Sequence, residues 1–315
     1  MKAEIEELDA AEAPLVTAVI STRDRGGAIV ETVRSVLLND YPRFELRVVD
    51  QSQDERAETA LRTFSGDSRF FYIRTATEGL STGRNLGISS ARGELIAITD
   101  DDCKVPTSWL RELVSAFAVD SRIGVVFGNV LPGPHDRAAG LVLSYVSRES
   151  FLAHSIREKH RVEGLGACMG LRRSVWQELD GFDQMLGAGA PLKSAEEADF
   201  AIRALLAGYY VYETPNLMVT HLGFRAREQS RHLIQGYLYG QGAMLVKHLR
   251  CQKWPIIRLL LHMARRWALE RSAIDLGDRS HRVLRLASFI QGFAAGAAMA
   301  VDRTTGCFKP LSVKR

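Results

Sequence analysis

Three consecutive aspartates, Asp100, Asp101 and Asp102, follow the apolar run 95–98 after a single threonine. Adjacent carboxylates repel one another, and each raises the pKa of its neighbours unless a cation lies between them. Mg²⁺ and Mn²⁺ are held in proteins by one or two carboxylates together with the phosphate oxygens of a substrate. A solvated acidic turn, with one aspartate capping the next helix, is the alternative. The position behind an apolar strand favours the cation site.

Apolar runs alternate with amphipathic segments through the first hundred residues. The pattern predicts strands over 15–21, 46–50, 70–74 and 95–99, with helices over 28–40, 54–64 and 81–93 between them. Such alternation is typical of an α/β protein with a mostly parallel, Rossmann-like sheet flanked by helices. Ligands of these sheets bind beyond the carboxyl ends of the strands. Polar groups follow three of these ends, at 22–25, 50–52 and 100–102.

The second half of the chain is less regular. It predicts a helix over 107–118, a strand over 123–130, helices over 172–180 and 195–207, and a strand over 209–213. The segment 132–164 loses its periodicity, and we expect one helix within it, near 138–155. The run 286–301 is shorter than the roughly 20 residues of a membrane span, and its Gly292 and Gly296 permit close helix packing. A packed helix is therefore favoured over an interfacial or a spanning one.

The composition is that of an ordinary globular protein, with 315 residues of which 46% are hydrophobic and 25% charged. The four cysteines are far apart, which excludes a CxxC zinc site and favours free thiols. The acidic first residues lack an apolar signal segment, so we expect a cytoplasmic protein with a flexible tail over 1–13. A net charge of only +4, without a zinc-finger or RNP-type motif, argues against nucleic-acid binding.

Several segments, taken in order, resemble the motifs of a known enzyme family. They are VTAVISTRDR at the first predicted strand, RVVDQS at the second, GLSTGRNLGISSARGELIAITDDDCKVPTSWL around the fourth, and GFDQMLGAG and EEADFAIRALLAG further on. Residues 14–225 are similar to a family 2 glycosyltransferase with the GT-A fold. The resemblance implies transfer of a sugar from a nucleoside diphosphate sugar to a hydroxyl acceptor, with inversion at the anomeric carbon and a bound Mg²⁺ or Mn²⁺ ion.

The resemblance also assigns roles to single residues. The DxD motif of the family falls on the three aspartates, where Asp102 matches the metal ligand, and Asp100 and Asp101 match positions near the ribose and base. His221 matches a residue that some members place on the metal or the diphosphate, with a structural histidine as the alternative. Four further residues match donor-binding positions: Thr22, Arg23, Asp50 and Arg84. For Asp50 a role in forming a turn stays open.

The catalytic base is expected in the segment 194–199, SAEEAD, which resembles the family's ED-x-D or ED-x-E motif. A carboxylate there would take the proton of the attacking hydroxyl. Glu197 aligns with the base, although a glutamate replaces the usual aspartate, and Glu196 stays open as the alternative. Ser194 and Glu197 also satisfy a capping box, in which Glu197 would only bond the backbone. Asp199 is expected to orient a neighbour or to contact the acceptor.

The resemblance predicts an enzyme that transfers one sugar per binding event, because the QxxRW motif and flanking membrane helices of processive synthases are not seen. A non-catalytic nucleotide-sugar-binding protein, with the C-terminal region as a docking surface, is the alternative. The expected acceptor is a glycan or a lipid-linked or cell-surface polysaccharide precursor.

The C-terminal region, 226–315, is predicted to be helical and basic. We expect six arginines to bring the enzyme to an anionic membrane surface, at the inner face of the cell membrane. They are Arg258, Arg265, Arg266, Arg271, Arg282 and Arg285. A solvated helical face or a contact in a homodimer is the alternative.

Overall fold

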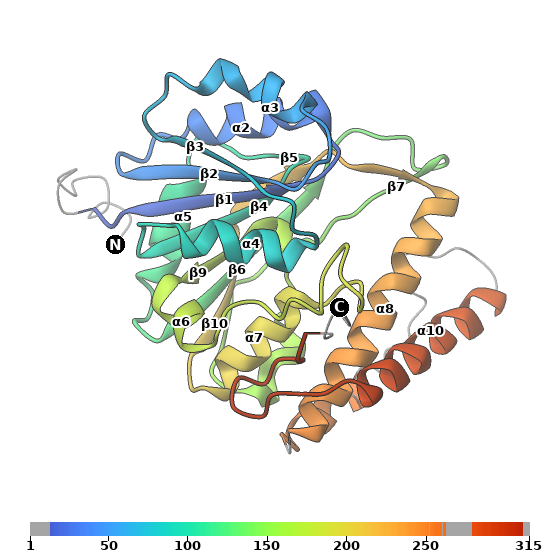
Figure 1. The fold of residues 1–315 in the computed structure, drawn as a ribbon. Helices are drawn as coiled ribbons and strands as arrows, with labels where there is room; N and C mark the ends of the chain where they lie inside the picture. The colour runs from blue at the N-terminus through green and yellow to red at the C-terminus, as the bar shows by residue number, and fades with distance from the viewer. Residues whose placement is uncertain (1–12, 252, 260, 263–278, 311–315) are drawn as a thin grey trace.

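The computed structural model describes residues 13–251, 253–259, 261–262 and 279–310 (Figure 1). Within this part of the chain, one sheet has the strand order β3-β2-β1-β4-β9-β6-β10-β5, with β8 paired to β10. Its strands are β1 (Val16–Thr22), β2 (Phe44–Asp50), β3 (Phe70–Arg74), β4 (Leu95–Asp100), β5 (Cys103–Lys104), β6 (Ile123–Pro132), β8 (Phe151–Ala153), β9 (Met169–Arg172) and β10 (Tyr210–His221). The strands predicted near 15–21, 46–50, 70–74, 95–99, 123–130 and 209–213 are confirmed.

Helices cover both faces of this sheet (Figure 1). They are α2 (Ile29–Leu37), α3 (Arg56–Leu61), α4 (Leu80–Ser89), α5 (Trp109–Phe117), α6 (Arg173–Glu178) and α7 (Glu196–Leu206), followed by α8 (Arg227–Arg250) and α10 (Arg279–Ala298). Apolar residues of α2, α3 and α5 belong to one hydrophobic core, and those of α4, α6, α7 and α8 belong to a second. The fold is therefore the α/β arrangement that the alternating pattern predicts.

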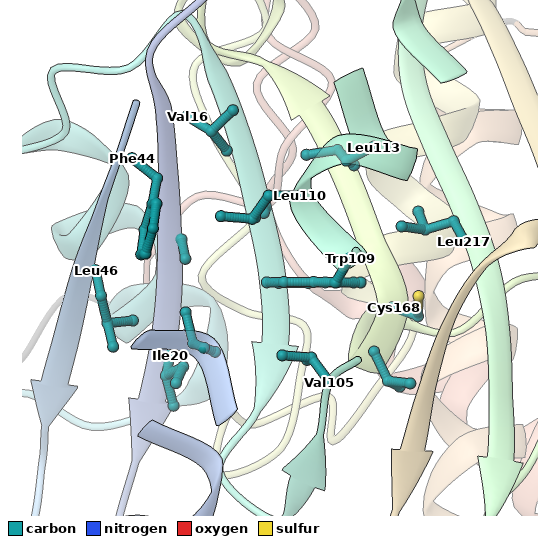
Figure 2. Close-up of a cluster of buried hydrophobic side chains, with 14 of the residues drawn as sticks. Val16, Ile20, Phe44, Leu46, Val105, Trp109, Leu110, Leu113, Cys168 and Leu217 are labelled. Carbon is teal, nitrogen blue, oxygen red and sulfur yellow. The ribbon is translucent and has the colours of Figure 1, made fainter. Parts of the chain in front are cut away.

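The two cores arise from the alternation of side chains along the central strands. In β1, Ala18 and Ile20 enter the first core, whereas Val19 between them enters the second. Figure 2 shows Trp109 and Leu110 of α5 lying against the first face, where Trp109 is 1% exposed. All residues of β1 except Ser21, and all residues of β4 except Asp100, are buried, which explains why these strands read as nearly continuous apolar runs.

Strands β3, β2, β1 and β4 run parallel, so their carboxyl ends meet at one edge. The second half of the sheet departs from this rule, because β9 runs antiparallel between β4 and β6. The pattern did not anticipate that strand. Its four residues lie between the glycine-containing segment 164–168 and α6, and a strand that short leaves almost no periodicity.

The helix predicted near 138–155 is wrong. The structure places β7 (Gly140–Val142) and β8 there, and β7 pairs with β11 (Phe224–Ala226) in a separate two-stranded ribbon. Buried Glu213 of β10 holds this segment, because it accepts a hydrogen bond from the Tyr145 hydroxyl at 2.8 Å and one from the Gly164 backbone at 3.3 Å. Bonds to a distant strand thus replace those of a local helix.

The C-terminal helices pack onto the sheet domain. Gly292 and Gly296 of α10 face α8, where a Cβ at Gly292 would lie 1.8 Å from the Tyr239 carbonyl oxygen. On α8, a Cβ at Gly240 would lie 2.3 Å from Ser194 Oγ, just before α7. The predicted packing of the 286–301 run is therefore confirmed. No helix in the described part of the chain is long and apolar enough to cross a membrane. Residues 1–12 of the predicted tail lie outside the described residues.

Candidate active site

The polar strand ends meet at one edge of the sheet because the parallel strands are in register. Thr22 at the end of β1 pairs with Asp50 at the end of β2, and Ser21 pairs with Asp100 at the end of β4. The three aspartates 100–102 therefore lie beside the loop 22–25. We call Asp100, Asp101 and Asp102 the acidic edge.

His221 reaches the acidic edge through a pair of short strands. β5 runs antiparallel to β10, and their register sets His221 opposite Cys103. The His221 Nε2 atom lies 3.0 Å from Asp102 Oδ1, and ligand atoms of Asp102, Cys103 and His221 all lie within 4.8 Å of one another. A Cβ on Gly223 would lie 2.3 Å from Asp102 Oδ2, so only glycine leaves room for this carboxylate.

The chemistry of these donors fits a divalent cation. Burial alone would raise the pKa of Asp102, but the bond with His221 and the charge of Arg25 hold that pKa below its usual range, so the carboxylate is ionised. The Nδ1 atom of His221 is buried and has no hydrogen-bond partner in the described part of the chain. Burial raises the pKa of the Cys103 thiol, which leaves Asp102 and His221 as the residues that could hold the ion.

Asp101 lies behind Asp102 and is bonded on both oxygens. Thr22 Oγ1 donates to Asp101 Oδ2 at 2.7 Å, and Arg25 Nε lies 3.1 Å from Asp101 Oδ1. Burial raises the pKa of Asp101 to about 6, although the charge of Arg25 opposes the rise. Thr22 therefore contacts the acidic edge directly.

Arg84 of α4 connects the acidic edge to the start of α7. Its Nη2 lies 3.0 Å from Asp100 Oδ1, and its Nη1 lies 3.0 Å from Glu196 Oε1. Nη2 also donates to the Gly166 carbonyl oxygen at 3.3 Å, and the side chain is 2% exposed. The buried guanidinium thus holds two carboxylates at fixed positions, and little of its own surface is left to contact a nucleotide-sugar donor.

Glu197 and its neighbour Glu196 differ in their exposure and in their partners. Glu197 is half-buried, and burial, followed by the negative charge of Glu196, raises its pKa. Tyr237 of α8 lies close by: burial and, next, the charge of Glu197 raise the pKa of its hydroxyl. The capping box predicted for Ser194 and Glu197 is not formed, because Ala195 begins α7 in a left-handed conformation with a φ of 75°. Ser194 Oγ instead donates to carbonyl oxygens of α8, 3.1 Å away at Gly236.

Two of the predicted donor residues lie at the margin of the site. Asp50 is fully buried; it accepts the Ser52 backbone N–H at 2.8 Å and the Tyr72 hydroxyl at 2.6 Å. It therefore fixes the turn after β2, as the alternative role required. Arg23 is half-exposed and pairs with Glu78 at 2.8 Å.

Asp199 is expected from the sequence to orient a neighbour or to contact the acceptor, and its ion-pair partners all lie away from the acidic edge. The carboxylate is fully buried and pairs with Arg203 at 2.9 Å, Lys247 at 2.7 Å and His248 at 2.8 Å. Burial would raise the pKa of Asp199, but Lys247 and Arg203 hold it far below the usual range. Every strong partner of this carboxylate is a side chain of α7 or α8, so Asp199 anchors α7.

Sequence reasoning missed three residues that the structure brings to the site. Arg25 contacts two members of the acidic edge, Arg225 lies 3.9 Å from Asp102 Oδ2, and the pKa of Tyr237 is raised by burial and by the charge of Glu197. A signal existed only for Arg25, which stands in the same TRDR loop as Thr22 and Arg23.

Solved structures share this fold. The mannosyltransferase PcManGT from Pyrobaculum calidifontis, in complex with GDP-Man and Mn²⁺, aligns over 92% of this chain and 89% of its own, with a TM-score of 0.62 and 18% identity. TarS from S. aureus, in complex with UDP-GlcNAc, aligns over 89% of this chain and 81% of its own, with a TM-score of 0.61 and 16% identity. The architecture is that of a GT-A glycosyltransferase.

The sequence comparison gives the family. The chain belongs to glycosyl transferase family 2, whose family model matches residues 17–179. A glucosyl-dolichyl phosphate glucuronosyltransferase of Haloferax volcanii is 25% identical over 239 residues, which are 70% of this chain and 75% of that protein. The glycosyltransferase GlyG of Streptococcus pneumoniae is 27% identical over 144 residues, 45% of this chain and 47% of that protein. The protein is therefore a glycosyltransferase.

Proposed function

We propose that this glycosyltransferase is metal-dependent and inverting, and that it moves one sugar from a nucleoside diphosphate sugar to a hydroxyl acceptor. One observation carries the proposal: Arg84 joins the acidic edge to the glutamate pair at the start of α7 through two contacts of 3.0 Å. This link supports a site in which a group for the leaving diphosphate and a group for the incoming hydroxyl lie close together. Mg²⁺ or Mn²⁺, held by Asp102 and His221, would act as a Lewis acid on the diphosphate.

We assign the base to Glu197. Glu196 Oε1 accepts a hydrogen bond from the buried Arg84, and a carboxylate held in such an ion pair is a weak proton acceptor. Glu197 has a raised pKa, which makes it a stronger base once it is ionised. A base on the side of the sugar opposite the leaving group gives inversion in a single displacement.

The donor is expected along the loop after β1. We propose that Thr22, Arg23, Asp100 and Asp101 lie along this approach and contact the nucleoside. The donor contacts of Asp50 and Arg84 stay predictions. In the structure Asp50 is bonded in the turn after β2, and Arg84 bridges two carboxylates.

Two measurements test this function. Thermal unfolding with UDP-, GDP- and dTDP-sugars, with and without Mn²⁺, identifies a donor, because ligands that bind the native state raise its melting temperature. Transfer to a hydroxyl acceptor, with the anomeric configuration of the product read by NMR, then tests inversion. A product that keeps the donor's configuration would contradict the single displacement, and absence of both transfer and donor hydrolysis would contradict the enzyme.

A non-catalytic, nucleotide-sugar-binding role remains the alternative. It requires that Glu197→Ala leave the biological activity of the protein intact while nucleotide-sugar binding persists. Loss of activity in a variant that still binds its donor would reject that alternative.

We further propose a lipid-linked or membrane-surface acceptor, reached through the segment 253–261. Trp254 is 63%, Ile257 41% and Leu261 54% exposed, and exposed Lys253 and Arg258 flank them. An exposed tryptophan and leucine beside cations suit the interface of an anionic bilayer. Arg265, Arg266 and Arg271, also predicted to bind the membrane, lie outside the described residues, and so does the side chain of Arg282.

Flotation with phosphatidylglycerol-containing liposomes at low salt tests this contact. Wild type should float with the vesicles, and a Trp254→Ala, Leu261→Glu variant should stay at the bottom of the gradient. Equal behaviour of both proteins would contradict the proposed surface. Exposed Val119 of the sheet domain, changed to glutamate, is the matched control and should float like wild type.

A further inference from the structure

The guanidinium of Arg25 lies against the acidic edge, where a bound cation would also lie. Its Nη2 lies 2.7 Å from Asp102 Oδ2, and its Nε lies 3.1 Å from Asp101 Oδ1. The side chain is 33% exposed, so it can leave these contacts without opening the core. One guanidinium thus neutralises part of the charge of two neighbouring carboxylates.

The backbone aims Arg25 at the acidic edge. Asp24 before it and Gly26 after it both have positive φ angles, of 58° and 54°. Ser52 Oγ accepts the Asp24 backbone N–H at 2.8 Å, which ties this turn to the end of β2. A non-glycine residue adopts such a φ only where its surroundings impose it. The inward position of Arg25 is therefore a feature of the loop.

We propose that Arg25 is a built-in counter-cation of the metal site, and that a divalent ion together with the donor diphosphate displaces it. The proposal rests on the function proposed above. A divalent cation on the Asp102 carboxylate would repel the guanidinium that lies 2.7 Å from Oδ2 of the same group, and it would compete with Arg25 for that negative charge. Binding of the ion alone therefore carries the cost of weakening the Arg25 contact.

The displaced guanidinium would have a second partner. It stands in the loop along which the donor is expected, two residues from Arg23, and guanidinium groups bind phosphate oxygens with two parallel hydrogen bonds. The ion would then take the carboxylate and Arg25 the diphosphate. Each ligand removes a cost from the binding of the other, so metal and nucleotide should bind cooperatively.

Mn²⁺ binding without a donor tests the proposal, with the free ion measured by its EPR signal. Arg25→Gln should bind Mn²⁺ about tenfold more tightly than wild type, because a cation in contact with the ligand carboxylate is removed. Arg25→Lys, which keeps the charge, should stay near wild type. Arg56→Gln is the matched control with the same change in net charge; Arg56 is 69% exposed and pairs with Asp54 at 2.8 Å. Its Mn²⁺ affinity should be unchanged.

A second series adds UDP or GDP, using the nucleotide that tightens Mn²⁺ binding more. The factor by which the nucleotide tightens Mn²⁺ binding should be about tenfold smaller in Arg25→Gln than in wild type. An unchanged or weaker Mn²⁺ affinity of Arg25→Gln without nucleotide, or an unchanged factor, would overturn the proposal. Asp102→Asn separates this failure from that of the proposed function. If it binds Mn²⁺ like wild type, the metal site itself is wrong, whatever Arg25 does.

Discussion

Lys247 of α8 is fully buried between two carboxylates, and its replacement by methionine should destabilise the fold by about 3 kcal/mol. Its Nζ lies 2.6 Å from Asp183 Oδ2 and 2.7 Å from Asp199 Oδ1, and all three side chains are 0% exposed. Methionine nearly preserves the volume, so the loss is electrostatic and involves no cavity.

The magnitude follows from what is left behind. Breaking a buried ion pair by removing one partner costs about 3–5 kcal/mol, because the other charge stays buried without compensation. In Lys247→Met, Asp199 keeps Arg203 and His248, whereas Asp183 keeps only backbone donors, at Met185 and Phe308. One carboxylate rather than two loses its cation, which places the expected loss at the lower end of that range.

Urea denaturation followed by circular dichroism measures the free energy of unfolding. Lys104→Met is the matched control, since Lys104 is 59% exposed and lies 3.6 Å from Glu31; it should cost no more than about 1 kcal/mol. Adding Asp183→Asn to Lys247→Met removes the uncompensated charge and should restore at least half of the loss. The reasoning is refuted if Lys247→Met costs no more than the control, or if the second substitution restores nothing.

The remaining predictions concern the site and the packing of the C-terminal helices. Glu197→Gln should lower kcat by at least 10²-fold with donor affinity kept, as measured by steady-state kinetics and calorimetry, whereas Glu196→Gln should also loosen the site by freeing Arg84. Burial and the charge of Glu196 raise the pKa of Glu197, so the base should become protonated, and kcat/KM should fall, at a higher pH than the pKa of a free glutamate, near 4.3. A fall of kcat/KM only near pH 4.3 would contradict the assignment of Glu197 as the base. Gly292→Ala should destabilise the fold by about 1–3 kcal/mol in urea, since a Cβ there meets a backbone oxygen of Tyr239, and an unchanged midpoint would contradict that packing.

The parallel half of the sheet could be predicted because its strands are buried on both faces and its helices are amphipathic. The acidic edge could be predicted as well, since Asp100 directly follows the strand predicted over 95–99. The antiparallel β9 and the pinning of 145–164 by Glu213 could not be predicted. These features depend on pairing between residues far apart in the sequence, which leaves no local periodicity.

The directions of side chains were the second feature that could not be predicted from the sequence. Asp199 stands in the EEAD segment, and sequence spacing cannot show that its carboxylate pairs with Lys247 and His248 of α8, away from the acidic edge. Similarly, the TRDR loop contains two arginines, and the sequence does not distinguish them. In the structure Asp24 has a positive φ, and the arginine that contacts Asp102 is Arg25.

These contacts also bear on the division of the chain into a catalytic domain, 14–225, and a basic helical region, which remains a prediction. Lys247 would pass for a solvent-exposed cation in a basic helix, yet it pairs with Asp199 of α7, three residues after Glu196. Ser194 bonds carbonyl oxygens of α8, and the close approach at Gly240 fixes α8 against the same turn. The position of Glu197 therefore depends on α8. A change in the packing of α8 should therefore also shift the proposed base through α7.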